Sequence, residues 1–219
     1  MLKFYEKLLR LFYFMPYGFS FDKDRWSNIR CAKDTIRLCN DLKIIPFTLV
    51  DVGANKSQWS IWLKRKWKNS LNIISFEPNI NFVPKGDNIF RLALTNSNRD
   101  DNINLVDNGG SSYISDTGTL KCKACRFDSL EIKIVRPAIL KVDCENFTYK
   151  ALEGFGERLK EFDVIVCEMW NYYSDLPQFV NQQLDIWKLM LSIGKKNCRV
   201  LDAVLTAKDG IPSYDIAFY

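Results

Sequence analysis

The sequence predicts an α/β protein built on a mostly parallel sheet of about seven strands, with helices on both faces and an antiparallel hairpin at its C-terminal end. Apolar runs with few charges alternate with helical patterns along the chain, as is typical of parallel strands buried on both faces. The last two runs, 199–205 and 214–219, are joined by a short Gly-Pro turn. They must therefore pair antiparallel, because a parallel crossover needs a dozen or more residues.

The predicted elements follow one another in a regular order. The first strand, 47–52, precedes a helix whose apolar face carries Trp59, Trp62, Leu63 and Trp67. The other strand-like runs are, in chain order, 71–78, 89–94, 101–106, 138–143, 162–168, 199–205 and 214–219. Further helices are predicted over 147–160 and 178–193, and 101–106 is interpreted as one arm of a hairpin.

The size and composition of the chain fit one substantial domain with a terminal extension. Its 219 residues are 47% hydrophobic and 14% aromatic, which supplies a large core. We expect residues 46–219 to form the α/β domain and 1–45 a helical extension that packs on this domain or on a homodimer partner. The apolar start of the chain predicts an amphipathic helix ending before Pro16, for which docking on a membrane surface is the alternative. No run is long enough to span a bilayer.

Charge and cysteine content indicate a reduced, cytoplasmic protein. The formal charge of +5 is mild, and basic clusters such as 64–68 are interpreted as solvated faces. The seven cysteines form no disulfide framework. Only Cys122 and Cys125 make a C-x-x-C motif, and the chain has no histidine, so the sequence offers no tetrahedral zinc site. The motif is interpreted as a surface loop with two ordinary thiols.

Carboxylates recur at the ends of the predicted parallel strands. Ligands of open α/β sheets bind beyond these carboxyl ends. Four of five such strands deliver an acid there: Asp51, Glu77, Asp143 (followed by Glu145) and Glu168, while the run 89–94 ends in Ala93 and Leu94. A cleft lined by acids suits a ligand that carries positive charge or many hydroxyl groups.

The loop after the first strand, in the stretch "LVDVGANKSQWS" (49–60), has one glycine where a dinucleotide fingerprint would have three. We expect Gly53 to let the backbone approach a ligand closely, and Ser57 to cap the following helix. Glu77, at the next strand end, is placed to bond ribose hydroxyls, and Asp51 to accept from an ammonium group. Since the loop lacks the glycines that a pyrophosphate needs, it predicts an amino-acid nucleoside such as S-adenosylmethionine.

Several segments together resemble the FkbM-type methyltransferases over 48–170. They are "VDVGANKSQWS", "ISFEPN", "LAL", "GGSS", "FDSL", "ILKVDCENFTYKALEGF" and "VIVCE". The most specific one, "LKVDCENFTYKALEG", is similar to the family's segment K-[IV]-D-x-E-G-x-E-x-x-x-L-x-G. The sequence departs from the family at Asn146 (usually glycine), Thr148 (usually glutamate) and Ser57 (commonly glycine).

The resemblance implies a Rossmann-like class I fold and S-adenosylmethionine-dependent O-methylation, often of sugar hydroxyls in natural products or surface glycans. It implies that Asp51, Gly53 and Asn55 line the methionine end of the cofactor, that Glu77 holds the ribose, and that Ala93 and Leu94 lie near the adenine. Ser111 and Ser112 would border the cofactor or the acceptor. The complete predicted cofactor set is Asp51, Gly53, Ala54, Asn55, Ser57, Glu77, Pro78, Ala93, Ser112 and Asp143.

A sugar hydroxyl must lose its proton as the new bond forms, and a chain without histidine needs another base. Asp143 is predicted to be that base, with Glu168 as the alternative. Lys141 lies on the same side of the strand, where it would tune Asp143 or neutralise a developing alkoxide; an ion pair that only orders the loop is the simpler interpretation. Asp143, Glu145 and Glu168 could also converge on magnesium, although we predict no metal.

Two other functions remain open at this point. One is an RNA or protein methyltransferase with the same cofactor, which the basic patch at 64–68 and the six tryptophans would support. The other is a non-catalytic scaffold of the same fold. We expect a small-molecule or glycan acceptor and no nucleic acid, because no nucleic-acid module is attached.

Overall fold

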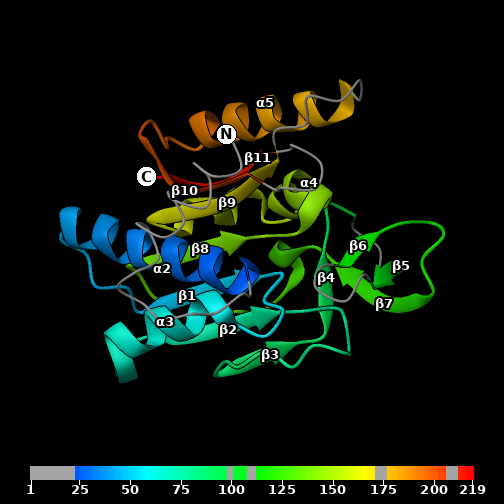
Figure 1. Ribbon diagram of the computed structural model, residues 1–219, viewed down its shortest axis with the longest axis horizontal. Coiled ribbons are helices and arrows are strands. Elements are labelled where there is room, and N and C mark those ends of the chain that lie inside the picture. The colour runs from blue at the N-terminus through cyan, green and yellow to red at the C-terminus, as the bar shows by residue number, and fades with distance from the viewer. Residues whose placement is uncertain (1–22, 98–100, 108–111, 171–176, 206–211) are drawn as a thin grey trace, which may run out of the picture.

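The predicted sheet is present in the computed structural model, which describes residues 23–97, 101–107, 112–170, 177–205 and 212–219. Its seven strands lie in the order β10-β11-β9-β8-β1-β2-β3 (Figure 1). Their bounds are Thr48–Val52 (β1), Asn72–Phe76 (β2), Asn88–Phe90 (β3), Ala138–Val142 (β8), Val164–Trp170 (β9), Cys198–Leu205 (β10) and Pro212–Phe218 (β11). Strand β11 runs antiparallel between β9 and β10, and the other neighbouring pairs are parallel. The prediction of the fold is confirmed.

Helices cover both faces of this sheet, as Figure 1 shows. Helices α2 (Lys23–Asp41) and α3 (Gln58–Trp67) bury apolar side chains against one face, among them Leu38, Trp59 and Leu63. Helices α4 (Thr148–Glu153) and α5 (Pro177–Ser192) pack on the other face through Leu152, Ile186 and Met190. Short 3-10 turns lie at Lys68–Ser70 (η1), Phe127–Ser129 (η2), Glu145–Phe147 (η3) and Gly156–Glu161 (η4).

The helix predicted over 147–160 is shorter than expected. It divides into α4 and η4 at two glycines, Gly154 directly after α4 and Gly156 at the start of η4. Gly156 takes a φ of +53°, in the left-handed region. A Cβ on Gly154 would lie 2.1 Å from the carbonyl oxygen of Thr95, so this glycine permits close contact with the segment after β4.

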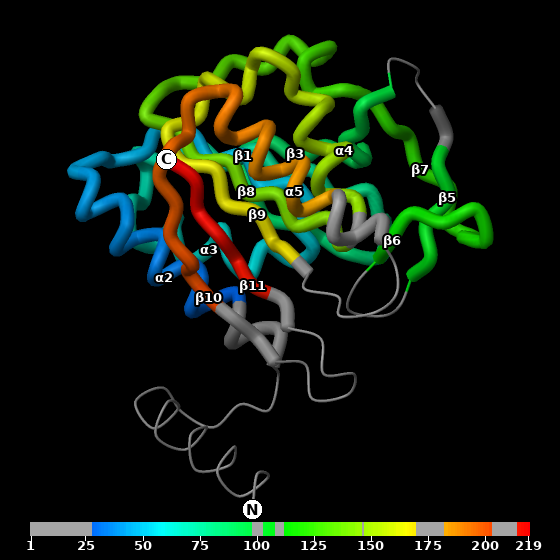
Figure 2. Tube along the Cα trace, turned by 90° about the horizontal axis from the view of Figure 1, so that it is seen from above, coloured from blue at the N-terminus to red at the C-terminus, as the bar shows by residue number. Residues whose placement is uncertain are grey.

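A second, four-stranded sheet was not predicted as such. It has the order β4-β7-β5-β6, with bounds Leu92–Leu94 (β4), Asp101–Asp107 (β5), Ser112–Ile114 (β6) and Leu120–Cys125 (β7). Figure 2 shows it at the opposite side of the molecule from α2 and β10. The predicted strand 89–94 is in fact two strands, because the chain leaves the main sheet between β3 and β4 at Arg91. The guanidinium of Arg91 donates to the carbonyl oxygens of Asn79 and Phe82.

The interpretation of the C-x-x-C motif as a surface loop was wrong. Cys122 and Cys125 lie on β7 and are buried, whereas Lys121 and Lys123 are exposed. This alternation is the pattern of a strand with one buried face, and burial raises the pKa of the Cys122 thiol to about 11. The hairpin predicted from 101–106 is confirmed, since β5 pairs antiparallel with β6.

Part of the expected N-terminal extension packs on the domain. Helix α2 contacts α3 and β10, and Cys31, Ala32 and Leu38 are fully buried there. The amphipathic helix expected before Pro16 lies outside the described residues, as does Ser111. Among the helices that the structure describes, none combines the length and the apolar character needed to cross a membrane.

Candidate functional site

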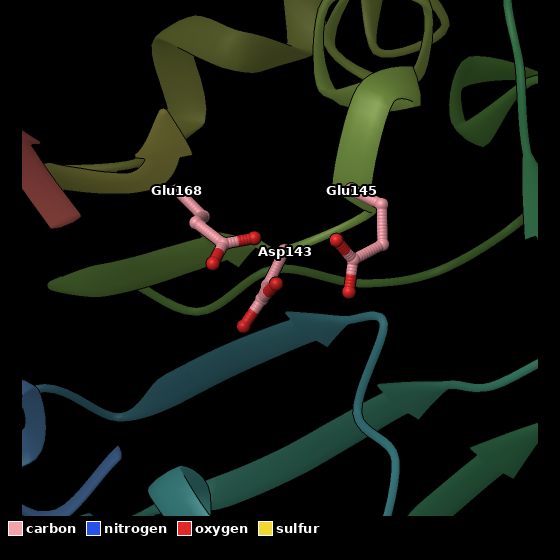
Figure 3. Close-up of side chains that lie close together, drawn as sticks. All are labelled: Asp143, Glu145 and Glu168. Atoms are coloured by element: carbon pink, nitrogen blue, oxygen red, sulfur yellow. The ribbon is translucent and has the colours of Figure 1, made fainter. Parts of the chain in front are cut away.

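Three of the predicted carboxylates meet at the ends of β8 and β9. Asp143 and Glu145 follow β8, and Glu168 lies on the neighbouring β9. One carboxylate oxygen from each lies within 4.8 Å of the others, and Figure 3 shows Asp143 between the two glutamates. Parallel neighbouring strands bring their carboxyl ends to one edge, which explains the convergence.

Lys141 is the cation of this cluster. Its side chain is buried, lies over the ring of Trp59 and donates to the Oδ2 atom of Asp143. Burial alone would lower the pKa of Lys141, but the charges of Asp143, Asp215 and Asp51 outweigh it and raise the pKa above the ordinary value. The ammonium is therefore charged at all physiological pH values.

Asp143 and Glu168 form a hydrogen-bonded pair that titrates unequally. Burial opposes ionisation of Asp143, but Lys141 and the hydrogen bond from Glu168 hold the pKa of Asp143 below its usual value. Burial, then the charges of Asp143 and Glu145, raise the pKa of Glu168 well above its usual value. Of the two carboxyls, Asp143 is therefore the one that loses its proton more readily, and Glu168 the one that retains its proton more firmly.

The single glycine of the first loop has a different role from the predicted one. Gly53 has a φ of +76°, and a Cβ placed on it would lie 1.9 Å from the carbonyl oxygen of Asp143. The glycine is therefore needed for close contact with the backbone after β8, and its approach to a ligand stays a prediction. The amides of Gly53 and Ala54 donate to the carbonyl oxygen of Phe76, which holds the loop between β2 and β8.

Glu77 joins the two loops that were predicted to hold a nucleoside. Its Oε2 atom accepts from the amide of Asn55 at 2.7 Å, and its Oε1 atom from the amide of Asn79 at 2.8 Å. Burial raises the pKa of Glu77 despite these two bonds. Pro78 connects Glu77 to Asn79 and is half-buried. The carboxylate is thus fixed in orientation at the end of β2, which is the requirement for a ribose-binding acid.

Ser57 does not cap α3 with its side chain, which corrects the prediction. It adopts the left-handed conformation, with φ +59°, and its hydroxyl instead accepts from the amide of Lys85 at 2.8 Å. The resembling family commonly has glycine at this position, and the observed φ gives the reason, because glycine adopts it without strain. Serine adopts this conformation at a cost in free energy, and its hydroxyl gains a hydrogen bond with the loop after β2.

We expect Ser57→Gly to be more stable than Ser57→Ala by about 1 kcal/mol. Both variants lose the hydrogen bond to Lys85, but only alanine keeps a Cβ in the left-handed region. Urea unfolding followed by tryptophan fluorescence measures the difference. Equal unfolding free energies for the two variants would contradict the strain at this position.

The remaining predicted cofactor residues lie around the second sheet. Ala93 and Leu94 are buried on β4, and Ser112 on β6 accepts from the side-chain amide of Asn79 at 2.8 Å. Asn79 is itself fully buried and connects Glu77 to β6. Asn79 had no predicted role, although it follows Glu77 by two residues in the segment "FEPN".

The segment after Asp143 combines backbone strain with two departures from the family pattern. Glu145 has a φ of +53°, which is unusual for a residue with a side chain and is found where a functional group must be held. The hydroxyl of Thr148 donates to the carbonyl oxygen of Glu145 at 3.3 Å. The side chain of Asn146 lies outside the described part of the chain.

The donor set fits an amino-acid nucleoside. Asp51 is 2% exposed, its Oδ2 atom has no hydrogen-bond partner among the described residues, and it lies at the start of the first loop. Burial raises its pKa, and Lys141 and a hydrogen bond with Ser60 oppose that effect. A fixed glutamate at one loop and acids at the others match a ligand with ribose hydroxyls and cationic groups.

Comparison with known proteins gives one family and a set of distant structures. The model of the methyltransferase FkbM domain family matches residues 51–198, and no curated protein matches the sequence. A solved O-methyltransferase from Bacillus cereus, in complex with SAH, is 11% identical (TM-score 0.47; 97% of this chain and 89% of that chain covered). A putative O-methyltransferase from Klebsiella pneumoniae is 10% identical (0.47; 92% and 81%), and precorrin-6y C5,15-methyltransferase from Geobacter metallireducens is 10% identical (0.45; 85% and 86%).

Proposed function

The chain belongs to the FkbM methyltransferase family, and we propose that it transfers a methyl group to the oxygen of a sugar hydroxyl, in a cell-surface glycan or a glycosylated product. One observation supports oxygen as the atom that is methylated. Asp143, whose carboxyl has a lowered pKa, stands at the end of β8 with Glu168 on one side and the buried ammonium of Lys141 on the other. Such a carboxylate is a base suited to a hydroxyl group.

S-adenosylmethionine is the cofactor, and when bound it supplies an electrophilic methyl group. We assign its ribose to Glu77, whose orientation the amides of Asn55 and Asn79 fix. Asp51 and the first loop would hold the amino-acid end, and Ala93 and Ser112 the adenine end. The protein's main contribution is then to hold two reactants in line, which accounts for much of the acceleration in such a displacement.

The proton of the acceptor goes to Asp143. Its low pKa means that it is ionised and available, and the hydrogen bond from Glu168 stabilises it before the transfer. Lys141 orients the carboxylate through its Oδ2 atom. We keep Glu168 as a positioning group, because its raised pKa favours the protonated form, which cannot accept the proton.

A neutral, hydroxyl-rich acceptor agrees with the charges around the site. Asp143 and Glu145 would repel a phosphate, whereas carboxylates accept hydrogen bonds from sugar hydroxyls. The basic residues that favoured RNA lie elsewhere. Helix α3 starts beside the first loop and runs away from the strand ends (Figure 1), so Lys64, Arg65 and Lys66 lie at its far end. Lys64 is also bonded to Asp87 at 2.9 Å.

We expect removal of Glu77's charge to weaken cofactor binding by about tenfold or more. In Glu77→Gln, an NH2 group replaces one carboxylate oxygen and faces a backbone N–H. One of the two backbone amides that donate to Glu77 therefore loses its acceptor. Isothermal titration calorimetry with S-adenosylmethionine measures the change. Glu153→Gln is the control, since Glu153 accepts a surface hydrogen bond from Asn96. Equal affinities of wild type and Glu77→Gln would contradict the assignment of the ribose.

We expect methyl transfer to continue in EDTA at a rate within about twofold of the untreated rate. The spacing of Asp143, Glu145 and Glu168 would also allow a divalent cation to bridge them, but Lys141 already pairs with Asp143, and the raised pKa of Glu168 favours its protonated form. The measurement is the initial rate after dialysis against EDTA, with and without added magnesium. Loss of activity that magnesium restores would make the cluster a metal site.

The proposed function is tested by screening acceptors with the purified protein. Formation of S-adenosylhomocysteine is measured with deoxyhexoses and other surface-polysaccharide sugars, and in parallel with RNA and with proteins. We expect turnover with a sugar and none with RNA. Turnover with RNA that falls steeply with salt would replace the sugar by a nucleic acid. Cofactor binding without turnover on any of these acceptors would favour a non-catalytic scaffold.

A further inference from the structure

A row of polar side chains crosses the main sheet on the face that α2 and α3 cover. Paired residues of neighbouring strands point to the same face of a sheet. The register pairs Asp51 with both Ser75 and Lys141, and pairs Asp215 with both Glu168 and Asp202. Lys141 pairs with Val166, two residues before Glu168, so all of these residues share that face. We call them the polar row: Ser75, Asp51, Lys141, Glu168, Asp215 and Asp202.

The members of the polar row are buried, except for the half-buried Glu168, and the row is incompletely hydrogen-bonded. Among the described residues, the buried side-chain atoms without a hydrogen-bond partner are Oδ2 of Asp51, Oγ of Ser75, Oδ1 of Asp215 and Nε1 of Trp59. Three belong to the row, and Trp59 on α3 lies beneath the ammonium of Lys141. Buried polar atoms are normally satisfied, and exceptions need a functional reason. The four exceptions gather around one lysine.

Asp215 and Asp202 lie opposite each other but have different partners. Both oxygens of Asp202 accept from the guanidinium of Arg30 on α2, at 2.9 and 3.2 Å. Asp215, which is 9% exposed, forms no ion pair of this kind with any residue that the structure describes. The titratable groups that face it are Lys141 on β8 with Asp143 beyond it, Glu168 on β9, Asp202 on β10, and Cys31 on α2. Lys141 is therefore the cation with which the negative charge of Asp215 interacts.

We propose that Asp215 is a positioning residue of the transfer reaction: a second buried counter-ion that keeps Lys141 charged and in place while Asp143 takes up the proton of the acceptor. The proposal rests on the proposed function for the proton step. In that step a lone pair of the acceptor oxygen forms the new bond to carbon. The carbon–sulfur bond breaks with its electron pair left on sulfur, and the proton moves to Asp143, whose charge is lost.

The need for a second counter-ion follows from this change of charge. Before the step the Lys141 ammonium is neutralised by Asp143, and after it Asp143 is neutral. A buried ammonium without a partner is costly. The carboxyls of Asp215 and Asp51 lie on the same face of the sheet, and their charges act on Lys141 and supply the compensation. Without Asp215, Lys141 would hold Asp143 more firmly in its ionised form, which makes Asp143 a weaker base.

The first test uses the protein without cofactor or acceptor. Carbon-13 NMR of protein labelled at its aspartate and glutamate carboxyl carbons follows Glu168 as the pH changes. Because the charge of Asp215 raises the pKa of Glu168, the titration of Glu168 should move to lower pH in Asp215→Asn. The matched control, Asp202→Asn, changes the neighbouring aspartate that is bonded to Arg30 and should leave the titration of Glu168 in place. An unchanged titration of Glu168 in Asp215→Asn overturns the proposal.

A second measurement separates this role from a structural one. Burial raises the pKa of Asp215 from 3.8 to about 6, although Lys141 opposes the shift. The folded protein therefore binds this proton more tightly than the unfolded chain, and the contribution of Asp215 to stability is lost as the pH rises from about 4 to about 6. In urea unfolding measured at several pH values, the free energy of unfolding of Asp215→Asn should not show this decrease between about pH 4 and about pH 6. A purely structural aspartate predicts the reverse, a variant less stable than wild type above pH 6.

Activity completes the test once an acceptor is identified. We expect kcat of Asp215→Asn to fall about tenfold while the acceptor KM and the affinity for S-adenosylmethionine stay unchanged. Asp215→Glu, which keeps the charge, should recover most of kcat. A fall in cofactor affinity of the same size as the fall in kcat would overturn the positioning role.

The outcomes remain interpretable when part of the system fails. If Asp215→Asn does not fold, the NMR titration of the wild-type protein still tests the proposal. The Glu168 resonance should then show a second inflection near pH 6 as Asp215 ionises. A Glu168 signal that does not respond to Asp215 overturns the proposal. If no acceptor is methylated, the proposed function fails, while the NMR and unfolding results still establish or refute the coupling.

Discussion

Replacing Asp143 with asparagine is expected to lower kcat by a factor of about 100 to 10,000, the usual contribution of a general base, and to leave cofactor affinity near that of wild type. Asparagine keeps the size of the side chain and one oxygen for Lys141, but it cannot take up a proton. Lys141 remains neutralised by Asp215 and Asp51, so the fold is expected to persist. Initial rates give kcat, and calorimetry with S-adenosylmethionine gives the affinity.

Glu168→Gln is the matched control, because the two carboxyls form one hydrogen-bonded pair with opposite preferences for the proton. Glutamine resembles the protonated form that the raised pKa of Glu168 favours, so we expect kcat to stay within about tenfold of wild type. The reverse result, a nearly active Asp143→Asn and an inactive Glu168→Gln, would make Glu168 the base.

The ends of the parallel strands were the part of the site that the sequence could predict. A buried apolar run that stops at an acid reveals both the strand and the side chain at its end. Since parallel strands share one edge, Asp143, Glu145 and Glu168 converge as expected, and so does the pair of Lys141 with Asp143. Glu77 likewise lies at the end of β2, where it was expected.

The contributions of the second sheet were harder to predict. Its strands are short, and the Lys-Cys alternation of β7 was read as a motif rather than as a strand with one buried face. The polar row depends on strand register, which brings Asp215 beside Glu168 although the residues are distant in the chain. The side-chain bond of Ser57 was also missed, because a positive φ at a serine contradicts its ordinary preference.

Replacing Gly53 with alanine is expected to lower the free energy of unfolding by more than about 3 kcal/mol and to abolish cofactor binding. Two costs add at this position. The φ of +76° is strained for alanine, and the new Cβ would lie 1.9 Å from the carbonyl oxygen of Asp143. To relieve this clash, the first loop must move away from β8. That movement shifts Asp51 and the backbone that positions the carboxylate of Asp143.

Gly194→Ala separates the two costs, because Gly194 has a φ of +89° but a Cβ there would meet nothing within 4 Å. It should lose only the conformational part, about 1 kcal/mol, and keep full cofactor affinity. Urea unfolding of both variants, with calorimetry on S-adenosylmethionine, measures the difference. Equal losses of stability would show that the first loop moves away from β8 at no cost. A large excess for Gly53→Ala identifies the contact with Asp143 as the reason that this loop needs its glycine.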